Sequence, residues 1–100
     1  MAENSIDLQG RNAVVTGGGA GLGFAIAERL AQSGANVCVW DINQDAIDEA
    51  VAKLAGEGDG SACGVVGNVA DVASVADAVK ATQDQLGGID ITVNNAGISG

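Results

Sequence analysis

The run from Gly17 to Gly23, GGGAGLG, contains only two side chains larger than a hydrogen atom. It follows an apolar segment that ends at Thr16, and it precedes an amphipathic stretch over residues 24–33. A strand that turns through glycines into a helix exposes backbone N–H groups at the positive end of that helix. Such a turn suits a diphosphate, so this run constrains both the fold and the ligand.

Apolar and amphipathic segments alternate along the rest of the chain. Short apolar runs predict strands at residues 12–16, 37–40, 63–66 and 89–93. Helices are predicted between them, with Asn43 and Asp71 as N-caps and with glycines at 34 and 87–88 as stops. This alternation favours an α/β fold with a Rossmann-like, doubly wound parallel sheet in the strand order 3-2-1-4 that stops after the fourth strand.

The length of 100 residues fits one domain and no more. Right-handed crossovers would place the first two helices on one face of the sheet and the third on the other. The first helix is predicted to bury Leu22, Ile26 and Leu30, which recur every four residues. The third is predicted to bury an apolar face that begins at Val72 and ends at Leu86.

The glycine spacing is T-G-x-x-x-G-x-G, set by Thr16, Gly17, Gly21 and Gly23, and it differs from G-x-G-x-x-G. The same roles fit: a tight turn, a close backbone approach to a pyrophosphate, and close helix–strand packing. Asp41 follows the second predicted strand, 41 − 23 = 18 residues after the last glycine. A carboxylate there would accept hydrogen bonds from both adenosine ribose hydroxyls and repel a 2′-phosphate, so Asp41 predicts NAD rather than NADP.

The segment Asn94-Asn95-Ala96-Gly97 follows the fourth predicted strand. In the order 3-2-1-4, this segment and the glycine run border the same crevice. Its small residues would let the backbone approach the inner ribose of the cofactor, and its amides would tie strand ends together. Taken alone, the segment would be interpreted as asparagines in an ordinary turn.

Together these residues resemble the short-chain dehydrogenase/reductase family, over essentially the whole chain from Leu8-x-Gly10-Arg11 onward. The resemblance implies a set of cofactor-binding residues. In the glycine loop these are Gly17, Gly19, Gly21, Leu22 and Gly23, with the backbone around Gly19 and Leu22 at the diphosphate. Asp41 and Ile42 match the adenosine-ribose positions, Asn68 and Val69 the pair at the adenine ring, and Asn95, Ala96 and Gly97 the inner face of the cofactor. Family members usually carry Asp at the position of Asn68. We expect this departure to lower cofactor affinity slightly and to leave function intact.

The family's catalysis depends on a Tyr-x-x-x-Lys motif, with a Ser upstream of it, that lies after the fourth strand. This sequence has no tyrosine, so it offers no catalytic residue of that kind. The resemblance implies that residues 1–100 are the N-terminal part of a single NAD(P)-binding Rossmann-fold domain. We expect this NAD-binding segment to belong to an oxidoreductase that transfers hydride between NAD(H) and a secondary alcohol or ketone, with 3-oxoacyl compounds among the candidate substrates. The chain alone is expected to be inactive and to bind NAD weakly or not at all. The alternative is a stand-alone, non-catalytic nucleotide-binding or scaffold module.

The net charge of −9 argues against a nucleic-acid partner, because only Arg11, Arg29, Lys53 and Lys80 are basic. No apolar run is long enough to span a membrane, and the first residues, MAENSIDL, do not fit a signal peptide, which predicts a cytoplasmic protein. Without histidine no common zinc site is expected, and Cys38 and Cys63 are interpreted as small buried apolar residues. The family resemblance further implies a homo-oligomer for the full-length protein.

Overall fold

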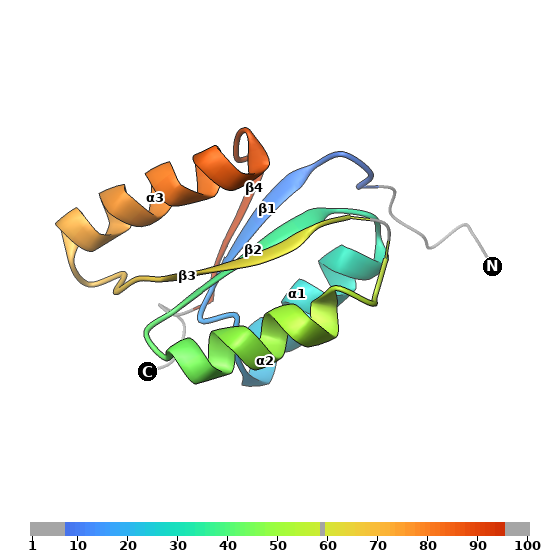
Figure 1. Ribbon diagram of the computed structural model, residues 1–100, viewed down its shortest axis with the longest axis horizontal. Helices are drawn as coiled ribbons and strands as arrows, with labels where there is room; N and C mark the ends of the chain where they lie inside the picture. The colour runs from blue at the N-terminus through green and yellow to red at the C-terminus, as the bar shows by residue number, and fades with distance from the viewer. Residues whose placement is uncertain (1–7, 59, 96–100) are drawn as a thin grey trace.

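The computed structural model describes residues 8–58 and 60–95. The elements in chain order are β1 (Asn12–Thr16), α1 (Gly21–Gln32), β2 (Asn36–Asp41), α2 (Gln44–Leu54), β3 (Ala62–Val66), α3 (Val72–Leu86) and β4 (Ile91–Asn94) (Figure 1). The strands form one parallel sheet in the order β3-β2-β1-β4. The predicted α/β class and strand order are therefore confirmed.

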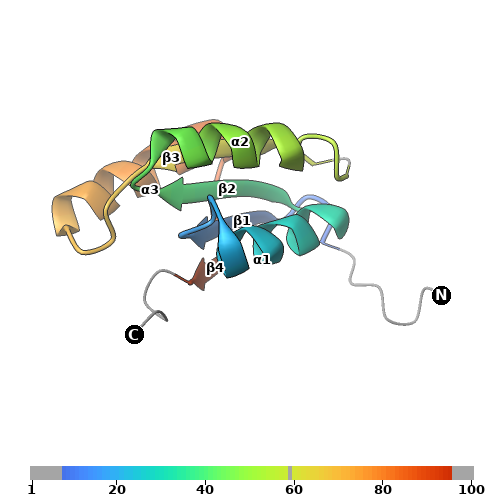
Figure 2. The same ribbon diagram turned by 90° about the horizontal axis from the view of Figure 1, so that it is seen from below.

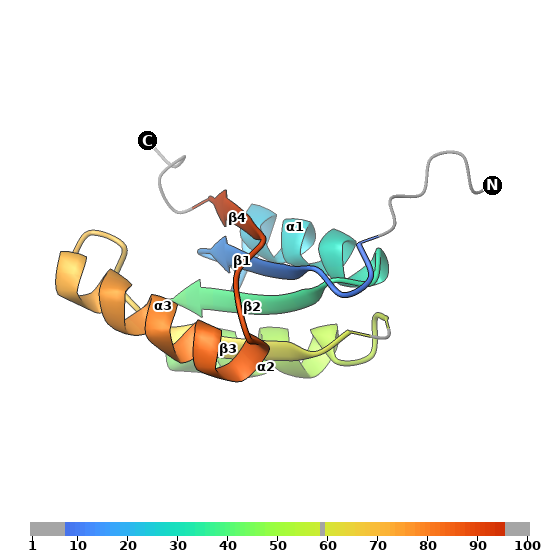
Figure 3. The ribbon, with the colours of Figure 1, turned by 90° about the horizontal axis from the view of Figure 1, so that it is seen from above.

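The helices lie in two layers around this sheet. α1 and α2 cover one face side by side (Figure 2), and α3 crosses the opposite face (Figure 3). This arrangement follows from right-handed crossovers, because the chain reverses its direction of winding between β3 and β4. The reversal places the ends of β1 and β4 at a switch point, where open α/β sheets bind ligands.

The central strands are apolar on both faces because each face is covered by helices. In β1, Ala13 and Val15 pack toward α1 and α2, whereas Val14 packs with Trp40 and Ala78 on the α3 side. Strand side chains point alternately to the two faces, so one short apolar run serves two core layers. This explains why Asn12–Thr16 shows no alternation of polar and apolar residues.

The α1 helix packs by a different face from the one that the sequence predicts. The buried residues of α1 are Gly23, Ala27 and Ala31. Leu22, expected in the core, is 62% exposed, and Ile26 and Leu30 are only partly buried. The helix lies so close to the sheet that only small residues fit beneath it, and the larger side chains are displaced to its flanks.

The α3 helix also departs from the expected apolar face. Val72 is 85% exposed, and the buried residues of α3 are Ala78 and Thr82. The Thr82 hydroxyl donates to the carbonyl of Ala78 at 2.8 Å and accepts from the indole Nε1 of Trp40 at 2.9 Å. A buried threonine is tolerated here because its hydroxyl is satisfied both as donor and as acceptor.

The two cysteines, distant in sequence, are direct partners across β2 and β3. Cys38 is buried as predicted, whereas Cys63 is only partly buried, which corrects the expectation for that residue. A hydrogen bond between the thiols lowers the pKa of Cys38 and, together with burial, raises the pKa of Cys63. Both are free thiols on the α3 side of the sheet.

Within the described parts of the chain, no helix has the length and apolar character needed to cross a membrane.

Candidate functional site

The carboxyl ends of the four strands meet at one edge of the sheet and bring the predicted site residues together. Thr16 is the register partner of Asn94, and its hydroxyl donates to the Asn94 Oδ1 atom at 3.1 Å. On the other side, the Gly67 amide donates to the Asp41 carbonyl at 3.0 Å. The loops after β1, β2, β3 and β4 therefore border one another, as the strand order predicts.

The glycine loop between β1 and α1 is fixed to the end of β2. The amides of Gly17 and Gly18 both donate to the carbonyl of Trp40, at 2.7 and 3.3 Å. Gly17 has φ +65° and Gly21 has φ +60°, a backbone region that glycine enters without strain. Two glycines are thus required by the turn itself, before any ligand is considered.

Gly23 is required by packing between α1 and the loop. A Cβ atom at Gly23 would lie 2.1 Å from the Gly17 oxygen and 2.7 Å from the Asn95 Nδ2 atom. The third glycine of the motif therefore allows close packing of the helix on the loop, which is the role that the sequence predicts for it. The same contact brings Asn95, from the loop after β4, to the start of α1.

The amino end of α1 differs from the other helix starts in residues 8–58 and 60–95. α2 is capped by Asn43, whose side chain accepts from the Ala46 amide, and α3 is capped by Asp71. The N-cap of α1 is Ala20, which supplies no side-chain acceptor, and the first turn contains no acidic residue. An anion placed there would satisfy the free N–H groups and interact favourably with the helix dipole.

Asp41 lies beside this loop, at the end of β2. Its Oδ2 atom accepts from the Gly19 amide at 3.1 Å, and its Oδ1 atom accepts from the Asn43 amide at 3.2 Å. A Cβ atom at Gly19 would lie only 2.7 Å from Oδ2 and 2.9 Å from the Ala46 Cβ atom. The absence of a side chain at residue 19 thus positions the carboxylate against the loop.

Exposed apolar side chains gather around the same edge. The large apolar side chains that are exposed in the described parts of the chain are Leu22, Ile42, Val66, Val69 and Val72. All lie in the loops after β1, β2 and β3 or in the adjoining ends of elements. Three of them, Leu22, Ile42 and Val69, are predicted cofactor contacts. Apolar side chains grouped in this way are typical of a binding surface.

The remaining predicted residues are placed less completely. Asn68 is exposed, and its Oδ1 atom accepts from the Ala70 amide at 2.9 Å. This oxygen retains a second lone pair that could accept from an adenine amino group. Asn95 lies at the start of α1, whereas Ala96 and Gly97 fall outside the described residues.

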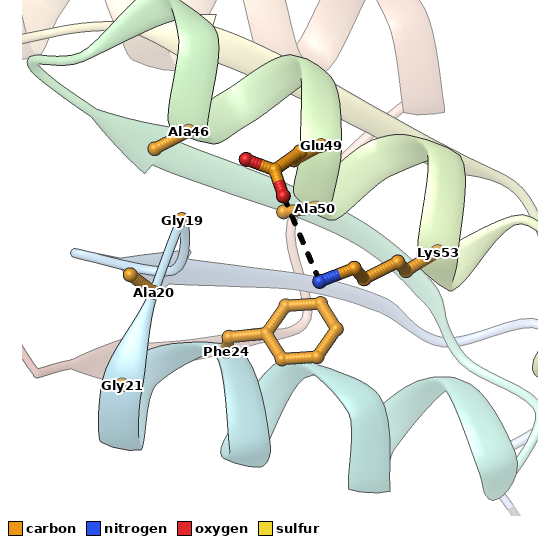
Figure 4. A pocket seen from close by; sticks show the side chains of 8 residues that line it. All are labelled: Gly19, Ala20, Gly21, Phe24, Ala46, Glu49, Ala50 and Lys53. Atoms are coloured by element: carbon orange, nitrogen blue, oxygen red, sulfur yellow. Dashed lines mark ion pairs between the residues drawn. The ribbon is translucent and has the colours of Figure 1, made fainter.

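A pocket of about 270 Å³ that the sequence did not indicate opens between α1 and α2 (Figure 4). The glycine loop forms one end of it at Gly19, and Phe24 lines the α1 side. From α2, Glu49 and Lys53 project into it and form an ion pair of 3.8 Å, with the Lys53 Nζ atom 5.6 Å from the centre of the Phe24 ring. The i, i+4 spacing of the ion pair is readable from sequence, but its position next to Phe24 and the loop is not.

Two further carboxylates act on this region. A hydrogen bond with Glu57 raises the pKa of Glu28, and burial and charge repulsion from Glu57 act in the same direction. The Lys53 charge opposes these effects and lowers the Glu28 pKa. Lys53 is thus close to Glu28 as well as to Glu49, and the region around it is acidic.

A doubly wound sheet with a glycine loop at its switch point defines a Rossmann-like protein. The chain matches the family described as short chain dehydrogenase over residues 11–100. It is 43% identical over 93 residues to 1-deoxy-11-beta-hydroxypentalenate dehydrogenase of Streptomyces avermitilis, covering 93% of this chain and 34% of the relative. The chain therefore belongs to the short-chain dehydrogenase family of oxidoreductases, and the recognition made from its motifs is confirmed.

Solved structures agree with this assignment. A hydroxysteroid dehydrogenase from Escherichia coli superposes with a TM-score of 0.85 at 37% identity, over 91% of this chain and 37% of that one. A 3-ketoacyl-(acyl-carrier-protein) reductase from Brucella melitensis, complexed with NADH, gives a TM-score of 0.78 at 31% identity over 86% of this chain and 34% of that one. The chain thus spans about a third of the length of such relatives.

Proposed function

We propose that residues 1–100 form the N-terminal part of a Rossmann-fold domain that binds NAD for an oxidoreductase acting on a secondary alcohol or ketone. The observation that carries this proposal is the position of the Asp41 carboxylate, which lies 3.1 Å from the Gly19 amide at the edge of the glycine loop. A ribose seated there would place two hydroxyl donors against a fixed carboxylate, and the adjoining diphosphate would lie at the uncapped start of α1.

The residues present fit such a cofactor. The amides at the start of α1 would bind the diphosphate, and Asp41 would bind the adenosine ribose. Ile42 and Val69 would contact the adenine ring with their exposed apolar side chains, and Asn68 would accept from its amino group. Asn95 would lie near the inner ribose, with Ala96 and Gly97 as further contacts. When bound, NAD supplies the hydride acceptor, or its reduced form the hydride donor.

NAD is favoured over NADP because the Asp41 carboxylate would repel a 2′-phosphate. The structure with NADH in the Brucella reductase supports a nicotinamide cofactor of this kind. The hydroxysteroid and ketoacyl relatives support a carbonyl or alcohol substrate. The chain has no tyrosine, so we propose that it performs no hydride transfer by itself.

The test is titration of the ¹⁵N-labelled chain with NADH and with NADPH, observed by NMR because binding by this chain is expected to be weak. We expect shifts at the glycine loop and around Asp41, with NADH bound more tightly than NADPH. Asp41→Asn should weaken NADH binding about tenfold, since hydrogen bonds to a charged group are worth about 1.5–3 kcal/mol and neutral ones about 1.

The matched control is Asp45→Asn, which removes the same charge from the first turn of α2 and should leave NADH affinity within about twofold. Tighter binding of NADPH than of NADH by the unaltered chain would contradict the NAD assignment. Absence of shifts at the glycine loop, with a well-folded spectrum, would favour a scaffold module. Measurable dehydrogenase turnover by the chain would contradict the proposed lack of activity.

A further inference from the structure

The pocket between α1 and α2 adjoins the place that the proposed function gives to the adenosine ribose. Gly19 belongs both to the pocket wall and to the Asp41 contact. A Cβ atom at this residue would lie 2.7 Å from the Asp41 Oδ2 atom on one side and 2.9 Å from the Ala46 Cβ atom, in the pocket wall, on the other. Only one glycine therefore separates the ribose position from the pocket.

The pocket has room for a substituent on that ribose. Its volume is about 270 Å³, far more than the roughly 10–15 Å³ that a cavity needs to hold one water molecule. The space exists because small residues line it on both sides, among them Ala20 in the glycine loop and Ala46 and Ala50 on α2. A 2′-phosphate directed past Gly19 would thus enter a space lined by alanine side chains and by the Phe24 ring, with Glu49 and Lys53 on its α2 side (Figure 4).

The charges in this pocket are unfavourable for a phosphate. Lys53 is the only cation among the described residues that line the pocket, and Glu49 pairs with it at 3.8 Å. The Lys53 charge also lowers the pKa of Glu28, so a second carboxylate, on α1, interacts with the same ammonium group. More than one carboxylate therefore opposes the charge of this ammonium group, and a phosphate dianion that entered the pocket would face net repulsion.

We propose that Glu49, through its ion pair with Lys53, is a second determinant beside Asp41 that excludes a 2′-phosphate from the adenosine ribose site. In the unaltered chain the pair keeps the Lys53 ammonium bound to a carboxylate and away from a phosphate. Removal of the Glu49 charge leaves the Lys53 ammonium free to contact a phosphate in the pocket. This inference rests on the proposed function, since it needs the ribose at Asp41.

The experiment compares ADP-ribose with 2′-phospho-ADP-ribose, both titrated by NMR into the ¹⁵N-labelled chain. The measured quantity is the ratio of the two dissociation constants, phosphorylated over unphosphorylated, which is expected to exceed one in the unaltered chain. Glu49→Gln should lower this ratio about threefold, a size suited to one solvent-exposed charge. The Glu49→Gln/Lys53→Met double variant should raise the ratio again, because the freed ammonium is gone.

The matched control is Asp48→Asn. Asp48 lies next to Glu49 on α2, is exposed and does not line the pocket, and its Oδ1 contact with Gln44 is retained by an amide. This variant changes the net charge of the chain by the same amount as Glu49→Gln, since each removes one negative charge, and it should leave the ratio within about 1.5-fold of its original value. The Glu49→Gln effect should also fade at about 1 M salt, where charge interactions extend only about 3 Å.

The two proposals fail in different ways. If ADP-ribose causes no shifts at the glycine loop of the unaltered chain, the cofactor assignment fails and this inference fails with it. If ADP-ribose binds there but Glu49→Gln and Asp48→Asn change the ratio equally, Glu49 has no specific role and this inference alone is overturned. The same conclusion follows if Lys53→Met leaves the ratio of the Glu49→Gln variant unchanged.

Discussion

Replacement of Gly23 by alanine tests whether close packing of α1 on the glycine loop maintains the site. The added Cβ atom would lie 2.1 Å from the Gly17 carbonyl oxygen, whereas real Cβ contacts are essentially never shorter than 3.0 Å. The two groups must therefore separate by at least 3.0 − 2.1 = 0.9 Å. The contact is with backbone, so no side-chain rotation relieves it, and α1 itself must move.

The expected cost follows from this displacement. Overpacking of a well-packed region costs about 1–3 kcal/mol, and a backbone clash belongs at the upper end of that range. Alanine gains about 1 kcal/mol over glycine in helix propensity, so the net loss in the free energy of unfolding is about 2 kcal/mol. For a domain with a stability of about 5–15 kcal/mol, this is a substantial fraction.

Urea unfolding measures this loss directly. Trp40 is the only tryptophan, so its fluorescence reports the transition, and far-UV circular dichroism checks that it is two-state. With a urea m-value of about 1–3 kcal/mol/M, the midpoint of Gly23→Ala should fall by about 1 M. Gly56→Ala is the matched control, because a Cβ atom there meets nothing within 4 Å and its φ is not positive. That control should keep or slightly raise the midpoint, and a Gly23→Ala midpoint equal to or above that of the unaltered chain would refute the packing argument.

Two further substitutions test the core and the acidic surface. Thr82→Val removes the hydroxyl that accepts from the Trp40 indole N–H at 2.9 Å, so it should lower the free energy of unfolding by about 1–3 kcal/mol and shift the indole N–H resonance. Thr82→Ser keeps the hydroxyl and should keep that resonance in place. Because Glu57 raises the pKa of Glu28, the folded chain binds a proton on the Glu28 carboxyl group more tightly than the unfolded chain does. The protonated carboxyl group therefore stabilises the fold at low pH, and this stabilisation is lost as pH rises through the raised pKa. Glu28→Gln should therefore raise the melting temperature, relative to the unaltered chain, more at pH 7 than at pH 4. An equal change at both pH values would contradict the interaction between Glu28 and Glu57.

The sequence predicted the order of elements well because each boundary has a local physical cause. Asn43 and Asp71 cap their helices as expected, and Gly87 ends α3 with φ +91°. The same local reasoning failed for the buried face of α1. Periodicity selects the large apolar residues Leu22, Ile26 and Leu30, but how closely a helix approaches a sheet is a tertiary property. A helix that lies close to the sheet buries glycine and alanine instead, and these small residues contribute least to an apolar periodicity.

In the candidate site, too, some features follow from local sequence patterns and others depend on tertiary packing. The sequence predicted that the glycine loop, Asp41 and the loop after β4 meet, because the strand order brings the carboxyl ends of the strands to one edge. The contact between Asp41 and Gly19 was not predicted, since it depends on how the loop folds back onto β2. The pairing of Cys38 with Cys63 and the pocket at Glu49 and Lys53 depend on register and on helix packing, which no local pattern encodes.

Trp40 connects the core to the proposed cofactor site and explains why a buried hydrogen bond on the α3 side bears on the glycine loop. Its indole packs among the residues under α3 and donates to Thr82, while its carbonyl accepts from the amides of Gly17 and Gly18. Asp41, the next residue, then accepts from Gly19. The position of the loop is therefore set by two adjacent residues of β2, of which one is anchored in the core and the other faces the proposed ligand. Because the loop has almost no side chains of its own, its conformation depends on these partners, and a change beneath α3 should reach the site through Trp40.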